Sequence, residues 1–494
     1  MPGRTAWLLA EQLSHENPAL EGATQVLLIE SEAKLRSARF HRQKLHLVLC
    51  AMRHFARELE GRGIAVDYLR ERDFVTAVRS HHARWRPEEI VLLEPTSPVA
   101  ARVLGNLPGV RLLDGTLFLT SASEFAGWAA DRGRLVMEDF YRWQRRRLGL
   151  LMDGEDPAGG RWNFDPQNRR PPPRAGRPPR PYQPREDELD AEVRRDLDRL
   201  RLPTVGRDGP RRWPANNAQA RRALSRFIET GLKDFGPYQD AMLHSEKYMW
   251  HSQLSSSLNL GLLDPLEAAR AAEASYRGSE APLASVEGFI RQVIGWREYV
   301  WGTYRLRQED WEQANALDAR SALPKVFRGG PTRMRCLEDA LAGVERTAYA
   351  HHIVRLMVFG NLMLLLGVRP QEASDWFQRS FIDGYEWVMA PNVIGMATWA
   401  DGGTMMTKPY AASGRYVDRM SDYCRRCTYD PGKRTGEDAC PFTTLYWDFL
   451  DRHRKRLAGN RRMKMPYRNL ERIDQRELSE IRRRASALRR DFEA

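Results

Sequence analysis

The chain has 494 residues, more than one hydrophobic core usually supports, so we expect at least two packed domains. Hydrophobic residues make up 42% of it and charged residues 29%, which excludes a disordered or membrane-embedded protein. Lysines and arginines number 78 against 65 aspartates and glutamates, a net charge of +13. This surplus fits a nucleic-acid-binding protein and a merely basic soluble enzyme equally well.

The sequence shows no pattern for export or membrane insertion. The first residues, MPGRTAWLLAEQL, reach polar residues before an apolar segment of signal-peptide length can form, so we expect a cytoplasmic protein. The most apolar stretch, 353–368, is interrupted by Arg355 and Asn361. It predicts a buried helix, and we expect no membrane partner.

The first third alternates short apolar runs with helical patterns. Strands are predicted at 5–10, 25–30, 65–69, 89–94 and 110–115, and a long helix at 41–63. This alternation predicts a parallel α/β sheet, and we place the domain at 1–130. No Gly-x-Gly-x-x-Gly motif follows the first strand, so a Rossmann-type dinucleotide site is not supported.

A connector then leads into a helical region. Residues 169–185 hold seven prolines and six arginines, a composition that forms neither a helix nor a central strand. We expect 131–215 to be an interdomain linker whose arginines keep it solvated, with contacts to DNA phosphates as the alternative. From 216 to 494 the apolar spacing predicts an all-α domain, as at Phe289, Val293, Trp296, Val300 and Tyr304.

The chain has five cysteines. Cys50 lies on the apolar face of the long predicted helix and is expected to be a core residue. The other four include a Cys-x-x-Cys pair, and thiolates in this pattern can share one metal centre; they are Cys336, Cys424, Cys427 and Cys440. A disulfide is the alternative, which a cytoplasmic location disfavours. The spacing alone leaves zinc and iron–sulfur equally open.

Four segments together resemble one known family. They are HSQLSSSLNLG at 251–261, GWREYVWG at 295–302, TAYAHHIVRLMVFGNLMLL at 347–365 and FIDGYEWVMAPNVIGMATWADGG at 381–403. Essentially end to end, the sequence is similar to the iron–sulfur bacterial cryptochromes and photolyases, which include the prokaryotic (6-4) photolyases. The resemblance implies the photolyase/cryptochrome fold, with an antenna-binding α/β domain and a large all-α FAD-binding domain. It also implies that the four cysteines hold a [4Fe-4S] cluster.

The family's FAD binds in the helical domain in a folded conformation, which fits the missing glycine motif. The cofactor residues that the resemblance implies are His251, Ser252, Gln253, Leu254 and Ser255 around the diphosphate, Gln292 and Arg297 on the following helix, and Asp383 and Asn392 against the isoalloxazine. Hydroxyl and amide groups near a helix start can satisfy phosphate oxygens. Without the family, the serines are an ordinary helix cap.

His351 and His352 occupy the family's paired-histidine position. Histidine changes charge nearest neutral pH, so we expect His352 to protonate the lesion and His351 to support it, with buried core histidines as the alternative. The lesion pocket of the family is matched by Met396, Tyr410 and Tyr416, which would replace the stacking partners of a flipped base. Nearby side chains that could pair with phosphates are Lys408, Arg415, Arg419, Arg425 and Arg426.

Trp376 would be the flavin-proximal member of an electron-transfer chain. The sequence departs from the family beside it: its aromatic neighbour is Phe377, which is hard to oxidise, and Arg328 stands at the expected terminal position. Met389 stands where some relatives carry an acid, which bears on flavin protonation and redox tuning.

The remaining implied cofactor is an antenna chromophore. Glu11 and Glu32 match its expected contacts, which favours 6,7-dimethyl-8-ribityllumazine, with a folate as the alternative. The resemblance therefore implies a monomeric, nucleoid-associated DNA photolyase. It would repair pyrimidine (6-4) pyrimidone photoproducts in UV-damaged DNA by electron transfer from photoexcited reduced FAD. The alternatives are a cryptochrome-like blue-light sensor that signals to a protein partner and a cyclobutane pyrimidine dimer photolyase.

Overall fold

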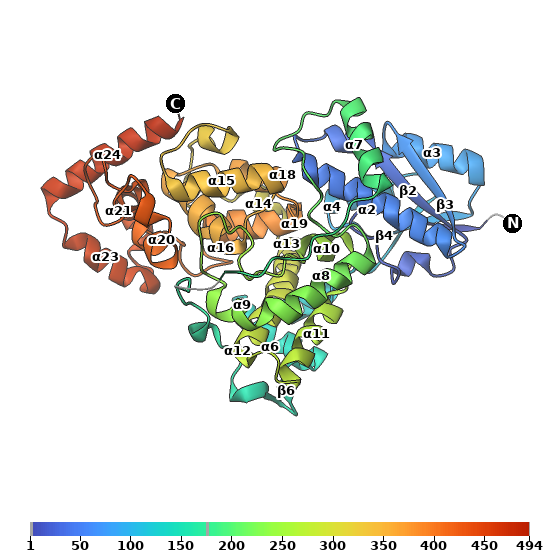
Figure 1. The fold of residues 1–494 in the computed structure, drawn as a ribbon, viewed down its shortest axis with the longest axis horizontal. Coiled ribbons are helices and arrows are strands. Elements are labelled where there is room, and N and C mark those ends of the chain that lie inside the picture. Colours follow the sequence, from blue (N-terminus) through green and yellow to red (C-terminus); the bar gives the residue numbers. More distant parts are fainter. Residues whose placement is uncertain (1–2, 174–176, 494) are drawn as a thin grey trace.

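The computed structural model describes residues 3–173 and 177–493. An α/β domain at the N-terminus is followed by a helical remainder, which confirms the predicted fold class. Figure 1 shows the α/β domain in blue at one end of the molecule and the C-terminal helices in red at the other. Of the predicted linker, residues 174–176 lie outside the described residues.

Five parallel strands form the sheet of the α/β domain, in the order β3-β2-β1-β4-β5. They are β1 (Arg4–Leu8), β2 (Gln25–Ser31), β3 (Ala65–Glu71), β4 (Glu89–Leu93) and β5 (Val110–Leu113). All five were predicted from their apolar runs. The central strand β1 pairs on both sides, with Trp7 opposite Leu27 in β2 and Leu92 in β4.

The two faces of the sheet carry different cores, because side chains along a strand alternate between its faces. Ala6 and Leu8 pack with the long predicted helix, α2 (Arg42–Gly61). Trp7 and Leu27 pack on the other face with α3 (Phe74–Trp85) and α4 (Pro98–Gly105). Because helices cover both faces of the sheet, the strands are continuous apolar runs in the sequence. The short α1 (Glu32–Arg36) follows β2.

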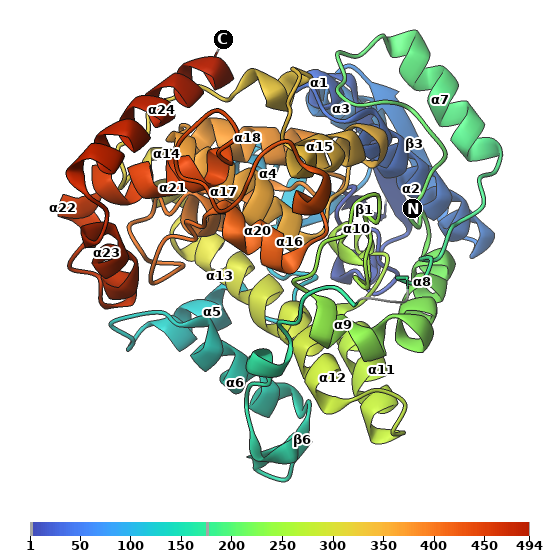
Figure 2. The ribbon, with the colours of Figure 1, turned by 60° about the vertical axis from the view of Figure 1, so that its left-hand side comes forward.

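The segment predicted to be a linker contains helices of its own. After α5 (Ala122–Ala129), α6 (Met137–Leu148) packs against the helical region, and α7 (Glu188–Leu200) packs along α2. Figures 1 and 2 both show α7 beside α2. Along the sequence, α6 is followed by a small hairpin, β6 (Met152–Asp153) and β7 (Asp156–Pro157). The described proline-rich residues have no regular structure, and the boundaries at 130 and 215 stay predictions.

The helical region follows, and no described helix is long and apolar enough to cross a membrane. Its first helices are α8 (Asn217–Thr230), α9 (Leu232–Tyr238), α10 (Ser255–Leu260), α11 (Pro265–Arg277), α12 (Leu283–Ile290), α13 (Glu298–Leu306) and α14 (Gln308–Gln313). The next are α15 (Arg335–Thr347), α16 (His352–Val354), α17 (Asn361–Leu366), α18 (Pro370–Ser380) and α19 (Glu386–Met389). The last are α20 (Gly414–Met420), α21 (Pro441–Arg452), α22 (Arg454–Leu457), α23 (Lys464–Glu471) and α24 (Gln475–Glu493).

Three segments of this region are π-helical: Arg291–Arg297, Arg355–Gly360 and Ala390–Ala397. A π-helical turn inserts a residue into an α-helix and re-aims its side chains, and such turns are frequent at functional sites. All three contribute side chains to one large cavity.

Candidate functional site

A cavity of about 830 Å³ lies in the helical region. All nine residues that the resemblance assigns to FAD line it, and they come from four separate segments: His251, Ser252, Gln253, Leu254, Ser255, Gln292, Arg297, Asp383 and Asn392. Pockets that bind cofactors typically enclose roughly 300–1,000 Å³. The fold therefore brings the predicted cofactor residues together around a space that can hold a dinucleotide.

The loop before α10 forms one wall of this cavity. Met249 and Gln253 have φ angles of 47° and 58°, a left-handed conformation that is strained for residues other than glycine. Such strain costs about 1–3 kcal/mol per residue and persists only where the surroundings fix the backbone. It turns the His251–Ser255 segment so that all five residues face the cavity.

Asp383 is held in a buried network at the cavity wall. Arg355 donates to both of its carboxylate oxygens, at 2.8 and 3.2 Å, and the Ser255 hydroxyl donates at 2.7 Å. Burial alone would raise the pKa of Asp383, but the Arg355 charge and these hydrogen bonds hold it below its usual range. The carboxylate therefore stays charged and fixed in orientation.

Sequence reasoning did not assign Arg355 to the site. The signal was present, because Arg355 interrupts the otherwise apolar stretch 353–368, and an arginine in such a stretch needs a buried partner. What the sequence could not supply was the identity of that partner, which lies 28 positions downstream.

The two adjacent histidines have different surroundings. His352 lines the cavity and is exposed to it, whereas His351 is 2% exposed and is not among the lining residues. The ring of His351 stacks on that of His251, with centroids 4.7 Å apart and planes 21° apart. His351 therefore packs against His251, which lines the cavity.

The protein around these rings disfavours their charged form. Although His352 is exposed to the open cavity, the protein that encloses the cavity shields its ring from bulk water; this desolvation, and then the charge of Arg355, lowers the pKa of His352 to about 4. Burial, and then His352, lowers the pKa of His251 to about 3, and burial lowers the pKa of His351 well below its ordinary value. At neutral pH all three rings are neutral unless a negative charge lies beside them.

Among the buried nitrogens without a hydrogen-bond partner, Nε2 of His251 and Nε of Arg297 lie at the cavity wall. Both residues line the cavity. A buried polar atom without a partner costs about 1–3 kcal/mol, so such atoms mark places where a polar ligand fits. The residues present thus fit a large, anionic, hydrogen-bonding cofactor such as FAD.

The predicted lesion residues line the same cavity. Met396, Tyr410 and Tyr416 are all on its wall, together with the basic side chains of Lys408 and Arg419. The guanidinium of Arg419 lies 5.6 Å from the centre of the Tyr416 ring. Arg415, Arg425 and Arg426, which were also predicted to pair with phosphates, are exposed and lie outside the cavity wall.

Trp376 is not among the residues that line the cavity, whereas Phe377 is. The indole packs edge-on against Phe377 at 4.9 Å and donates to the backbone oxygen of Phe327 at 2.9 Å. The sequence reasoning overlooked two tryptophans that do reach the cavity, Trp296 and Trp387. Met389, which was predicted to stand where some relatives carry an acid, also lines it.

The two predicted antenna residues are not brought together. Glu11 accepts hydrogen bonds from the backbone and hydroxyl of Thr96, at 2.8 and 2.9 Å, and burial raises its pKa. Glu32 pairs with Arg36 on the exposed side of α1, at 2.7 Å. Neither residue lines the large cavity.

The four C-terminal cysteines surround a small cavity of their own. Cys336 is at the start of α15, Cys440 immediately precedes α21, and Cys424 and Cys427 lie in the turn between α20 and α21. None of them forms a disulfide. Burial, and then the charges of the other three, raises the pKa of the Cys336 thiol well above its ordinary value. A metal centre would relieve this, because it binds the deprotonated form.

Thiolates gathered around one cavity can hold a zinc ion or an iron–sulfur cluster. Among the described residues, the group of three possible ligand atoms that lie within 4.8 Å of one another does not include these cysteines.

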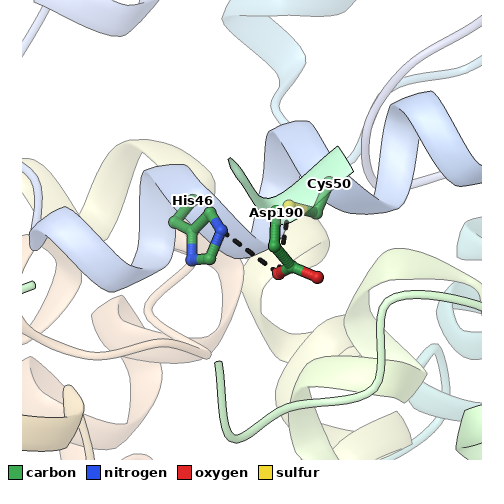
Figure 3. A group of neighbouring side chains, drawn as sticks. All are labelled: His46, Cys50 and Asp190. Atoms are coloured by element: carbon green, nitrogen blue, oxygen red, sulfur yellow. Dashed lines mark hydrogen bonds and ion pairs between the residues drawn. The ribbon is translucent and has the colours of Figure 1, made fainter. Parts of the chain in front are cut away.

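One closer group exists among the described residues, formed by His46, Cys50 and Asp190 (Figure 3). Its ligand atoms lie within 4.8 Å of one another, but Arg211 already donates to both oxygens of Asp190, at 2.6 and 2.9 Å. The guanidinium supplies the positive charge that a cation would bring, and burial raises the pKa of Cys50. This group ties α7 to α2, and Cys50 is a buried core residue as predicted.

Comparisons with known proteins agree with this geometry. Residues 6–213 match the family model described as deoxyribodipyrimidine photo-lyase-related protein. A bacterial class III photolyase from Agrobacterium tumefaciens has the same fold, with a TM-score of 0.58 at 16% identity over 99% of this chain and 98% of that one. A (6-4) photolyase from Agrobacterium fabrum is 42% identical over 98% of this chain and 99% of its own. Because that similarity runs through both chains from end to end, this chain belongs to the photolyase family.

Proposed function

We propose that the protein is a DNA photolyase that repairs (6-4) photoproducts by light-driven electron transfer from reduced FAD. The observation that carries the proposal is that one cavity is lined by the cofactor residues, the lesion residues and His352. Electron transfer is fastest when the cofactor and the lesion are close together, and a shared cavity would hold them close. Identity of 42% to a (6-4) photolyase along the whole chain supports the choice of lesion.

The chain's own residues would bind and orient the cofactor. Asp383, fixed by Arg355 and Ser255, would face the isoalloxazine with a charged carboxylate. Arg297, which packs 4.1 Å from the centre of the Phe118 ring, would meet an anionic group with its free Nε. When bound, reduced FAD supplies on excitation the electron that the lesion needs.

His352 would deliver the proton. Its low pKa makes it neutral at pH 7, so it becomes an acid only when negative charge enters the cavity beside it. DNA and a reduced flavin both bring such charge. Proton delivery is thereby coupled to occupancy of the site, and the proton lies on an imidazole nitrogen of His352 that faces the lesion.

Tyr410, Tyr416 and Met396 would receive the flipped lesion. Their aromatic and apolar surfaces replace the stacking that the bases lose when they leave the duplex, and they exclude water from the reacting bonds. Lys408 and Arg419 stand at the same wall, where they would pair with flanking phosphates.

Two further cofactors belong to the proposal. The four cysteines, which surround one small cavity, would hold a [4Fe-4S] cluster. A lumazine antenna would bind near Glu11, between the sheet and the helical region. We further propose that the protein acts as a monomer on UV-damaged DNA at the nucleoid.

Lesion preference is tested by offering chemically reduced protein three otherwise identical duplexes, with one (6-4) photoproduct, one cyclobutane dimer or no lesion. We expect blue light to restore only the first, and His352→Asn to abolish that repair while FAD stays bound. Restoration of the cyclobutane dimer alone would assign the other photolyase activity. Restoration of neither, with reduced FAD bound, would favour a light sensor.

A further inference from the structure

A second, smaller pocket lies beneath the proline-rich segment. Its wall includes three arginines, Arg180, Arg212 and Arg226, and no aspartate or glutamate. It shares one wall with the large cavity, because His251, Ser252 and Gln253 line both.

The three arginines lack carboxylate partners among the described residues, unlike Arg211 and Arg221 nearby, and Arg212 lies beside the Tyr248 hydroxyl. Arg221, on the same helix as Arg226, pairs with Glu267 at 2.9 Å, whereas none of the three has a carboxylate of the described residues within 4.0 Å. Within the described part of the chain, Arg226 donates to the backbone oxygen of Arg180, at 3.4 Å. Nε of Arg212 is buried without a hydrogen-bond partner.

This arrangement is rigid. Pro179 and Pro181 fix the backbone on both sides of Arg180, and Pro214 fixes it two residues after Arg212, since proline locks φ. Gln183 donates to the backbone oxygen of Arg211 at 2.7 Å, which joins the two stretches of chain that carry Arg180 and Arg212. Arg211 itself donates to Asp190, which Figure 3 shows beside His46 and Cys50. The site is thus held open by covalent and buried constraints.

Three guanidinium groups around one pocket repel one another, and a buried donor without an acceptor adds its own cost of about 1–3 kcal/mol. A phosphate group removes both costs, because its oxygens accept several charge-assisted hydrogen bonds from guanidinium groups. We propose that Arg180, Arg212 and Arg226 form a phosphate-binding site.

Two sources of phosphate are available if the proposed function holds, and the inference rests on it for both. The flavin dinucleotide carries a diphosphate, and its expected position is at the His251–Ser255 loop, the wall between the two cavities. DNA carries backbone phosphates, and both Arg180 and Arg226 are exposed to reach them. The proline-rich segment would then be part of a binding site and more than a solvated linker.

The test compares single variants Arg180→Gln, Arg212→Gln and Arg226→Gln with Arg270→Gln. Arg270 is exposed and outside the pocket, so the control removes the same charge. For each purified holoprotein we would measure FAD content, inorganic phosphate binding by ³¹P NMR, and the salt dependence of binding to undamaged duplex DNA. Arg212→Lys keeps the positive charge but loses the planar set of N–H donors of the guanidinium. Partial recovery in this variant would show that Arg212→Gln lost a binding site and did not merely misfold.

A cofactor source predicts that FAD content falls at least threefold in Arg212→Gln, with partial recovery in Arg212→Lys, and that the wild-type holoprotein binds no added phosphate. A DNA source predicts normal FAD content, phosphate binding by the wild type that Arg212→Gln loses, and a salt slope reduced by about one in Arg180→Gln and Arg226→Gln. If FAD content, phosphate binding and salt slope all match those of Arg270→Gln, the site does not exist. None of these readouts needs light or a lesion. If the variants behave as the phosphate site predicts but the protein repairs no lesion, only the proposed function would be overturned.

Discussion

Replacing Asp383 by asparagine should destabilise the protein far more than the same change at Asp375. Each aspartate pairs with an arginine at 2.8 Å, but the Asp383–Arg355 side chains are 8% and 16% exposed, whereas those of Asp375–Arg379 are 55% and 43% exposed. Removing one partner of a buried pair leaves an uncompensated charge and costs about 3–5 kcal/mol. An exposed pair on a helix contributes about 0.5 kcal/mol or less.

The assay is urea unfolding followed by tryptophan fluorescence for both single variants, with Arg355→Met and the Asp383→Asn/Arg355→Met double variant added. Because the two residues form one unit, the double variant should lose less stability than the sum of the single variants. Equal losses for Asp383→Asn and Asp375→Asn, or full additivity with Arg355→Met, would refute the idea that this pair is a buried structural unit of the site.

Three other outcomes follow from the structure. The free energy of unfolding should be independent of the rings of His251 and His351 above pH 6.5 and fall as the pH drops below 6.5. The reason is that the pKa of His251 in the folded protein is about 3 and that of His351 is well below its ordinary value, so the unfolded chain takes up protons first. The loss should be no more than about 1.4 kcal/mol per pH unit for each ring. Urea unfolding at pH 7 and 5 checks this, and His351→Asn should flatten the dependence; an unchanged slope would contradict it. Cys440→Ser should lose iron and brown colour yet keep FAD, whereas full iron content by elemental analysis would exclude this cysteine as a ligand. Phe377→Tyr should speed photoreduction of bound FAD, measured by its absorbance in blue light with a thiol reductant, because it places an oxidisable ring on the cavity wall; an unchanged rate would show that electrons enter elsewhere.

The α/β domain could be predicted because its strands are short and buried on both faces. Val26, Leu27 and Leu28 form an uninterrupted apolar run, and each of them is fully buried in β2. The helices of 131–215 were not foreseen. The sequence of α7 places Leu189, Val193 and Leu197 at helix spacing on one buried face, but the proline-rich composition just before it concealed this signal.

That the nine residues proposed to bind FAD would line one cavity could be anticipated only through family resemblance. Periodicity says nothing about contacts between segments more than a hundred positions apart, such as that between Ser255 and Asp383. The same limit hid the stacking of His351 on His251, since both histidines are unremarkable in their own segments. Trp387 escaped notice because a tryptophan in a helical segment is indistinguishable from a core residue until the cavity beside it is known.

The central claim is that FAD and the lesion occupy one cavity, in contact. The measurement that tests it most directly is the fluorescence lifetime of reduced FAD in the protein, bound either to a duplex with one (6-4) photoproduct or to the undamaged duplex. We expect the lesion duplex alone to shorten the lifetime, because the excited flavin loses an electron to a base within contact distance. An unchanged lifetime with the lesion duplex fully bound would contradict a shared cavity.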